Sequence, residues 1–173
     1  MNFTIEKSIE ILERTPDVLI TMLDGISGDW IYKNEGGSTW KVYEVVYHLI
    51  LGEKTDWAER TGIILSEKKV SERVFKPFKR FENPNDETMS ELLNEFKSLR
   101  KKNLRYLHSL DLQDFHLNEK GIHPDFGEVA LYQLLAAWVV HDLDHLAQIA
   151  RIMAYQYSED VGPWKEYLRI VKR

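Results

Sequence analysis

The stretch that decides the fold is EVALYQLLAAWVVHDLDHLAQIARIMAY, residues 128–155. Alternating steps of three and four residues trace one side of a helix here, and that side is mostly apolar. The positions on this seam are Leu131, Leu134, Trp138, His141, His145, Gln148 and Ile152. Burying an unpartnered polar group costs about 1–3 kcal/mol. Two histidines and a glutamine within the seam therefore predict something inside the protein that they bind.

Other long segments also have helical periodicity, and a shorter one lies near the C-terminal end. We expect helices over residues 4–26, 38–62, 88–110 and 128–155, and a short helix over residues 163–171 that folds back on the others. Thr88 and Glu91 form a capping box, in which the hydroxyl and the carboxylate satisfy each other's backbone donors. Pro16 interrupts the first segment and predicts either a kink or a new helix start.

These amphipathic helices predict an all-α protein, a four-helix bundle that forms a single domain over residues 1–173. No segment alternates for long enough to build a sheet, and residues 121–127 are predicted to be a loop. Antiparallel neighbouring helices need only ~2–8 connecting residues. The connection from Gly62 to Thr88 is far longer, which disfavours a simple up-down-up-down topology.

The composition is that of one folded globular domain. Hydrophobic residues make up 43% and charged residues 29% of the 173 positions, which is ordinary for such a chain. Lys and Arg number 23 against 28 Asp and Glu, a net charge of −5 that argues against a nucleic-acid partner. The lack of cysteine excludes disulfides, thiolate nucleophiles, iron–sulfur clusters and cysteine-based zinc sites.

The sequence predicts a cytoplasmic protein that does not associate with a membrane. No basic start followed by an unbroken apolar stretch marks a signal peptide at the N-terminus. The most apolar run, Leu134–Val140, is far shorter than the ~20 residues that a membrane-spanning helix needs.

Two basic segments have ordinary structural explanations. Residues 76–81, KPFKRF, mix basic and aromatic side chains in a way that suits single-stranded nucleic acid. A solvated loop that packs its phenylalanines on the bundle is the favoured interpretation. The charged run over residues 99–102 is interpreted as a solvated helix face.

His141 and His145 are four residues apart, so both imidazoles emerge on one helix face, one turn from each other. Two nitrogen ligands at this spacing can bind a single metal ion. The alternative is a pair of hydrogen-bonded core or surface histidines. The spacing resembles the HExxH motif of zinc proteases, but Asp142 stands where the glutamate base would be, and we do not expect a protease.

His48 lies in the second predicted helix, on a face that borders its apolar stripe. Gly52, one turn later, would leave space beside the imidazole for a bound group. Three neutral imidazoles from two facing helices would bind a divalent transition metal and leave positions open for water or substrate. That pattern is typical of catalytic rather than structural metal sites.

The ligand type narrows the metal without selecting one, since imidazole suits zinc, nickel, iron and copper. A histidine ligand usually donates its second nitrogen to a neighbouring acceptor, which orients the ring. The candidates for this role are Glu44, Glu53, Asp144 and Gln148. A solvated helix surface is an equal alternative for each of the three acids.

Several motifs resemble the DinB/YfiT-like superfamily over almost the whole chain. The most specific element is the coupling of His48 to HDLDHLAQIAR at residues 141–151. The segment over residues 40–57, which contains Gly52-Glu53 and Asp56-Trp57, also resembles the family. So do HPDFGE at residues 123–128 and GPWKEYL at residues 162–168.

The resemblance implies a four-helix bundle with up-down-down-up topology, which would account for the long connection before Thr88. It also implies a nickel or zinc ion on His48, His141 and His145, with iron or manganese as alternatives, and a homodimer. Members of the family include thiol-dependent S-transferases that use bacillithiol or mycothiol, a maleylpyruvate isomerase and metal-dependent hydrolases. The family name refers to induction by DNA damage and gives no reason to expect DNA binding.

The leading hypothesis is a metal-dependent S-transferase that acts on small electrophiles. The metal would acidify a bound water or a low-molecular-weight thiol cosubstrate, which are the only catalytic groups that the sequence indicates. One alternative is a hydrolase of a small ester or amide at the same site. Another is a non-catalytic metal-binding or interaction module, because fold alone does not establish function.

Overall fold

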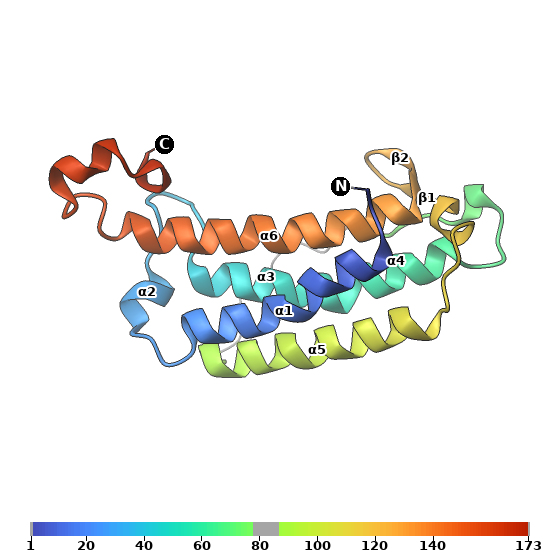
Figure 1. The fold of residues 1–173 in the computed structure, drawn as a ribbon, viewed down its shortest axis with the longest axis horizontal. Coiled ribbons are helices and arrows are strands. Elements are labelled where there is room, and N and C mark those ends of the chain that lie inside the picture. Colours follow the sequence, from blue (N-terminus) through green and yellow to red (C-terminus); the bar gives the residue numbers. More distant parts are fainter. Residues whose placement is uncertain (1, 78–86, 173) are drawn as a thin grey trace.

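The computed structural model describes residues 2–77 and 87–172, in which four long helical segments lie side by side (Figure 1). The segments are α1 (Ile5–Leu23), α3 (Val42–Thr55) continued by α4 (Trp57–Ile64), α5 (Met89–Ser109) and α6 (Leu131–Tyr155). The shorter elements are α2 (Gly28–Tyr32), β1 (Lys120–His123), β2 (Gly127–Ala130) and the 3-10 turns η1 (Val70–Glu72), η2 (His116–Asn118), η3 (Gly162–Glu166) and η4 (Arg169–Val171). The predicted helical bundle is confirmed.

The directions of the helices confirm the up-down-down-up topology. In Figure 1, α1 and α6 run from right to left, whereas α3, α4 and α5 run from left to right. Because α3 and α5 are parallel, the chain has to return along the bundle between the end of α4 and the start of α5. The long connection in the sequence has this topological cause.

The first predicted helix is one continuous element, α1, which passes through Pro16. Proline has no N–H to donate to the carbonyl four residues earlier, so the carbonyl of Leu12 lacks its helical partner. Arg100 of α5 supplies the missing donor, with Nη1 2.7 Å from the oxygen of Leu12. A defect in one helix is thus satisfied by a buried side chain from another.

The second predicted helix is two helices, and the prediction of a continuous helix over residues 38–62 is wrong at Asp56. This residue has φ −112° and ψ −74° and joins the end of α3 to the start of α4. Its carboxylate pairs with Arg60 at 2.9 Å. Trp57, directly after the junction, is buried and stacks on Trp138 of α6 at a ring-centroid distance of 5.7 Å.

The segment predicted to be a loop before α6 is an antiparallel hairpin, in which β1 pairs with β2 from Lys120↔Ala130 to His123↔Gly127. Gly121 packs tightly there, since a Cβ at this position would lie 2.7 Å from Phe75 Cε1. The hairpin also takes residues 128–130 out of the predicted helix, so that α6 begins at Leu131. The short C-terminal helix consists of the two 3-10 turns η3 and η4, and η4 contacts α6.

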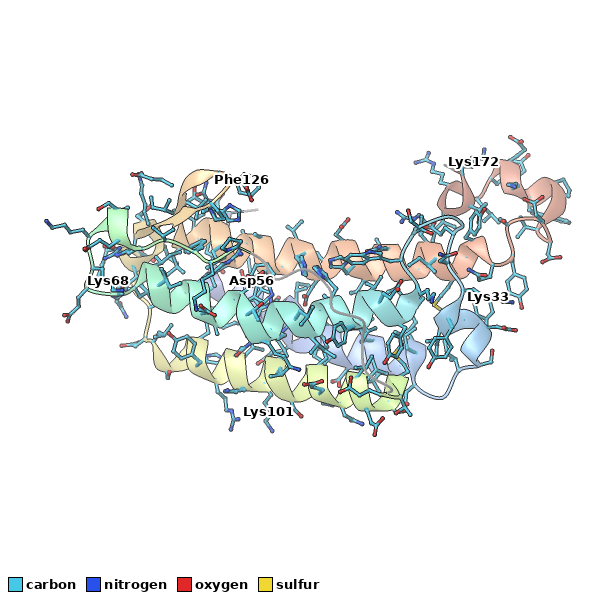
Figure 2. All side chains as sticks on the ribbon, turned by 180° about the vertical axis from the view of Figure 1, so that it is seen from behind. Lys33, Asp56, Lys68, Lys101, Phe126 and Lys172 are labelled. Carbon is cyan, nitrogen blue, oxygen red and sulfur yellow. The ribbon has the colours of Figure 1, made fainter. Side chains whose placement is uncertain are left out.

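Two apolar clusters fill the bundle, and buried polar side chains lie between them along each helix. On α5, Arg100 falls between Phe96 of one cluster and Leu104 of the other. The buried polar positions at this level include Thr15, Glu53, Arg100, Asn103 and Asp142. This polar layer separates the two apolar clusters. Figure 2 labels Phe126 and Lys68 toward one end of the molecule and Lys33 and Lys172 toward the other.

Within residues 2–77 and 87–172, no helix combines the length and the apolar character needed to cross a membrane.

Candidate metal centre

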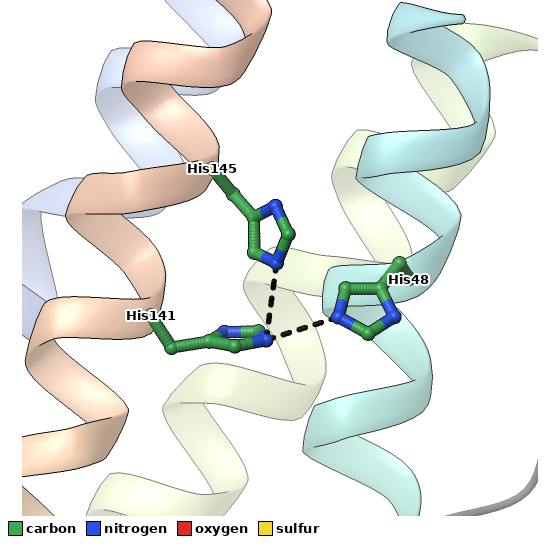
Figure 3. A group of neighbouring side chains, drawn as sticks. All are labelled: His48, His141 and His145. Atoms are coloured by element: carbon green, nitrogen blue, oxygen red, sulfur yellow. Dashed lines mark hydrogen bonds between the residues drawn. The ribbon is translucent and has the colours of Figure 1, made fainter. Parts of the chain in front are cut away.

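Three histidine side chains from α3 and α6 point toward one another at the interface of the two helices (Figure 3). The Nε2 atom of His48 lies 3.0 Å from the Nε2 atom of His141. The Nε2 atom of His145 lies 3.2 Å from the same atom. The structure therefore brings together the three histidines that the sequence singled out.

Local helix geometry produces this convergence. His141 and His145 stand one turn apart on α6, which places their rings on one face with centroids 4.3 Å apart. His48 faces them from α3, and its neighbours Val45 and Leu49 are buried in the core, which fixes the rotation of that helix. His145 is buried, and the other two histidines are half-buried.

Hydrogen bonding alone does not satisfy these three nitrogens. A neutral imidazole has one donor nitrogen and one acceptor nitrogen, so His141 Nε2 cannot both donate to one neighbour and accept from the other. The other nitrogen of this ring, Nδ1, is buried and has no hydrogen-bond partner among the described residues. Three converging lone pairs are what a cation would bind.

The spacing of the nitrogens fits one transition-metal ion. Two nitrogens bound to the same zinc ion at ~2.0–2.1 Å and at tetrahedral or octahedral angles lie ~2.8–3.4 Å apart. The separations of His141 Nε2 from the other two Nε2 atoms, 3.0 and 3.2 Å, fall in this range, and the ligand atoms of all three histidines lie within 4.8 Å of one another. Imidazole nitrogens suit zinc, nickel, iron and copper, so the donor set fits the group without selecting the element.

Burial keeps two of the histidines neutral. Desolvation, followed by the charge of His145, lowers the pKa of His48 to about 4. Desolvation, followed by the charges of the other two histidines and of Arg100, lowers the pKa of His141 to about 3. Both rings are therefore neutral at neutral pH, as a metal ligand requires.

Gln148 orients the ring of His145. The Oε1 atom of Gln148 lies 2.8 Å from Nδ1 of His145 and accepts a hydrogen bond from it. This hydrogen bond puts the proton on Nδ1 and leaves the Nε2 lone pair directed at the other two histidines. Fixing the tautomer in this way is what a partner of a ligating histidine does.

Glu44, Glu53 and Asp144 were also candidates for hydrogen bonds to the histidine rings, and in the described part of the chain none of them makes one. Glu44 accepts from the backbone N–H of Lys41 at 2.7 Å and so caps the start of α3. Asp144 is exposed on α6 and lines a surface groove with Arg151 and Ile170. Glu53 is buried, but its contacts are with Arg100, Asn103 and Trp138 rather than with a histidine.

Tryptophan rings surround the cluster on both sides. Trp40 lies 5.1 Å from the ring of His48 and stacks at 6.3 Å on that of His145. Trp57 meets His141 edge-on at 5.1 Å. A Cβ on Gly52 would be 3.1 Å from Nε1 of Trp57, so the indole fills the space that was expected beside this glycine.

Sequence reasoning missed Arg100, because the run over residues 99–102 was assigned to a solvated face. Lys101 points away from the bundle (Figure 2), but the side chain of Arg100 is only 1% exposed. Asp142, the residue in place of a protease glutamate, is fully buried and pairs with Arg100 at 2.7 Å. It is therefore not available as a general base. Pro16, which leaves a carbonyl open on the facing helix, is the sequence signal for the buried arginine.

The remaining histidines lie outside this cluster. His108 is exposed on α5, and His123 accepts from the backbone N–H of Asp125 at 3.1 Å in the hairpin turn. The basic and aromatic segment over residues 76–81 falls outside the described residues from position 78 onward.

Comparisons with known proteins agree with this fold. The sequence model of the DinB superfamily matches residues 11–149. Among solved structures, YfiT from Bacillus subtilis superposes with a TM-score of 0.72 at 19% sequence identity, and the match covers 93% of this chain and 91% of that one. YfiT is described as a probable metal-dependent hydrolase with an unusual four-helix bundle topology. No match is found among curated proteins.

Proposed function

This chain belongs to the DinB superfamily, and we propose that it is a metal-dependent enzyme whose divalent ion is held by His48, His141 and His145. The observation that carries the proposal is the convergence of three histidines, with the Nε2 atoms of His48 and His145 at 3.0 and 3.2 Å from that of His141 and all three ligand atoms within 4.8 Å of one another. Nickel and zinc are the leading candidates for the ion, and iron and manganese are alternatives.

A divalent ion in such a site acts as a Lewis acid that acidifies a coordinated water or thiol. The residues of the chain have distinct tasks around it. The neutral rings of His48 and His141 offer lone pairs, and Gln148 holds His145 in the matching tautomer. Trp40 and Trp57 surround the histidines with apolar surface, which limits the access of bulk water.

The reaction that we favour is the transfer of a low-molecular-weight thiol to a small electrophile. Three protein ligands leave coordination positions for a second molecule, as in catalytic metal sites. The uncharged rings around the site suit a compact reagent better than a polyanion. The resemblance to thiol-dependent S-transferases of this superfamily favours this reaction among those available to the site.

Hydrolysis of a small ester or amide is the second candidate. The description of YfiT as a probable metal-dependent hydrolase, together with the shared fold, supports it. In this case water takes the position of the thiol, and the same three histidines serve. A non-catalytic metal-binding module is the third possibility, in which the bound ion supports no turnover.

One assay separates the three. Protein reconstituted with nickel or zinc is mixed with a panel of small thiols and a chromogenic electrophile, and in parallel with a chromogenic ester without thiol. Thiol-dependent turnover supports the transferase, and turnover of the ester without thiol supports the hydrolase. The absence of both activities supports the binding module. The variant His141→Ala serves as the control, since turnover that survives it does not arise at this site.

We also propose a homodimer as the working form. Val140 and Leu143 expose 63% and 46% of their surface on α6, which would suit a second copy of the chain. Light scattering of the purified protein tests this directly. The cytoplasmic location, the single-domain organisation and the absence of a nucleic-acid partner stay predictions from the sequence.

A further inference from the structure

Arg100 of α5 uses every hydrogen-bond donor that it has inside the bundle. A guanidinium carries five N–H groups. Two of these donate to Glu53 Oε1, two to the carboxylate oxygens of Asp142 and one to the carbonyl of Leu12, at donor–acceptor distances from 2.7 to 3.1 Å. One planar group therefore links α5 to α1, α3 and α6.

Other residues of the bundle also donate hydrogen bonds to Glu53. Glu53 Oε1 also accepts from Nε1 of Trp138 at 2.9 Å, and its Oε2 accepts from Nδ2 of Asn103 at 2.9 Å. The same amide of Asn103 donates to the backbone carbonyl of Glu53 at 2.8 Å. Each of these hydrogen bonds is donated by an N–H group, and the donors on Arg100 and Asn103 oppose the rise in the pKa of Glu53 that burial causes.

A gain in stability is a weak explanation for burying these charges. Removing charges from water is costly, and a buried ion pair often contributes no more than apolar side chains of the same volume would. What a buried network of this kind can supply is one fixed arrangement of the elements that carry it. The question is therefore which arrangement the network fixes here.

The network lies close to the histidine cluster along both α3 and α6, the two helices that carry the histidines. Asp142 directly follows His141 on α6, and Glu53 lies five residues after His48 on α3. A second connection runs through aromatic rings. Trp138, which donates to Glu53, stacks on Trp57, and Trp57 meets the ring of His141. Through both connections, the position of the Arg100 guanidinium affects how α3 and α6 are placed relative to each other.

We propose that Arg100, through Glu53 and Asp142, sets the separation of His48 and His141 and so positions the metal ligands. This inference rests on the proposed function for the metal itself. Arg100 is a positioning residue, since its hydrogen bonds go to Glu53, Asp142 and the carbonyl of Leu12 and to none of the three histidines. Metal ligands tolerate errors of only ~0.2 Å, so a tie between the two helices at this level has a direct effect on affinity.

The test compares variants of this network with variants of a second arginine–carboxylate pair, Arg151 with Glu35, in which the arginine is 47% exposed. Arg100→Lys and Arg100→Met remove the guanidinium that pairs with both Glu53 and Asp142. Asp142→Asn weakens its own pairing with Arg100 with almost no change in the shape of the side chain. Arg151→Lys and Arg151→Met are the controls, because Arg151 makes two hydrogen bonds to buried Glu35, at 2.9 and 3.0 Å, with no contact to a histidine. Each protein is titrated with Co²⁺, whose visible absorption reports ligand geometry, and its melting temperature is recorded.

We expect the Arg100 variants and Asp142→Asn to bind Co²⁺ at least about tenfold more weakly, with an altered visible spectrum. The Arg151 variants should keep the affinity and spectrum of the parent, even where their melting temperature falls. Unchanged affinity and spectrum in the Arg100 variants would overturn the proposal. So would equal losses of affinity in the two series. If Arg100→Met does not fold, Asp142→Asn and Arg100→Lys decide.

A second readout needs no metal. In the metal-free protein, the ring ¹⁵N shifts of the three histidines report their mutual contacts. We expect these shifts to move in Arg100→Lys and to stay in place in Arg151→Lys, and the reverse pattern would contradict the proposal. A parent protein that binds no Co²⁺ would contradict the proposed function, while the ring shifts still decide the positioning role.

Discussion

The Nε2 atoms of His48 and His141 lie 3.0 Å apart although 93 positions separate the two residues in the chain. One comes from α3 and the other from α6, two helices that the fold packs against each other. When both rings carry their proton on Nδ1, as metal binding through Nε2 requires, this contact brings two lone pairs together, and these repel. A cation between them removes this repulsion.

Removing α6 ligands should abolish metal binding without unfolding the protein. We predict that His141→Ala, His145→Ala and the double variant lose stoichiometric metal and keep the helical circular dichroism spectrum of the parent. Elemental analysis of the purified proteins measures the loss. His108→Ala is the matched control, since this histidine is exposed on α5. One metal ion per chain in the double variant would contradict the assignment.

The partner of His145 should matter for affinity more than for stability. Gln148→Ala removes the acceptor of the Nδ1 proton and frees the ring to change tautomer. We predict that metal affinity falls by about 10–100-fold, as is typical for partners of ligating histidines. Competition with a chromophoric chelator measures the affinity. The control is Gln156→Ala, which removes another glutamine whose side chain donates to backbone carbonyls. This variant should bind metal like the parent.

The stability of the metal-free protein should fall as the pH is lowered from about 6.5 toward 4. Burial lowers the pKa of His48 to about 4 and that of His141 to about 3, whereas an unfolded histidine titrates near 6.5. Between these values the unfolded chain binds more protons than the folded one, so acid favours unfolding, and stability returns as the pH rises.

Urea unfolding of the metal-free protein between pH 7 and pH 4.5 measures this dependence. The variant His48→Gln with His141→Gln should show a flatter profile, because it lacks the two lowered pKa values. An identical slope in the parent and the variant would show that these two rings do not cause it.

Gly121→Ala should destabilise the hairpin end of the bundle. A Cβ there would lie 2.7 Å from Phe75 Cε1 and 2.9 Å from Ile64 Cγ1, so the core has to shift. Overpacking of this kind costs about 1–3 kcal/mol of unfolding free energy. Gly25→Ala is the comparison, because its Cβ would meet open space and only its positive φ of 74° opposes the change. Equal stability of Gly121→Ala and the parent in urea would refute the tight packing.

The capping box should stabilise α5 by a measurable amount. Thr88 Oγ1 accepts from the backbone N–H of Glu91, and the Glu91 carboxylate accepts from that of Thr88. We predict that Thr88→Ala lowers the unfolding free energy by about 1 kcal/mol. Thr21→Ala, which loses only a hydroxyl bonded to the carbonyl of Asp17, should cost less. A loss in Thr88→Ala no larger than in Thr21→Ala would contradict the role of the cap.

The sequence predicted the helices well because helix periodicity and capping depend on residues that are close together in the chain. The seam over residues 131–152 gave α6, and Thr88 with Glu91 gave the start of α5. The same seam indicated which face of α6 holds the histidines. The pairing of His141 with His145 also follows from spacing alone, since a helix turn brings them together.

What the sequence did not predict depends on contacts between distant segments. Arg100 sits in a charged run that looks solvated, and only the open carbonyl of Leu12 and the two carboxylates of other helices make its burial favourable. The junction at Asp56 and the filling of the space beside Gly52 both depend on how Trp57 packs on Trp138. No periodicity within one helix reports such contacts.

The central claim is that three imidazoles bind one ion, and X-ray absorption at the edge of the bound metal tests it most directly. Protein reconstituted with one nickel or zinc ion should show a first shell with three imidazole nitrogens at ~2.0–2.1 Å. The imidazole signal should decline in His48→Ala. A first shell of oxygen atoms alone, or a spectrum that His48→Ala leaves unchanged, would contradict it.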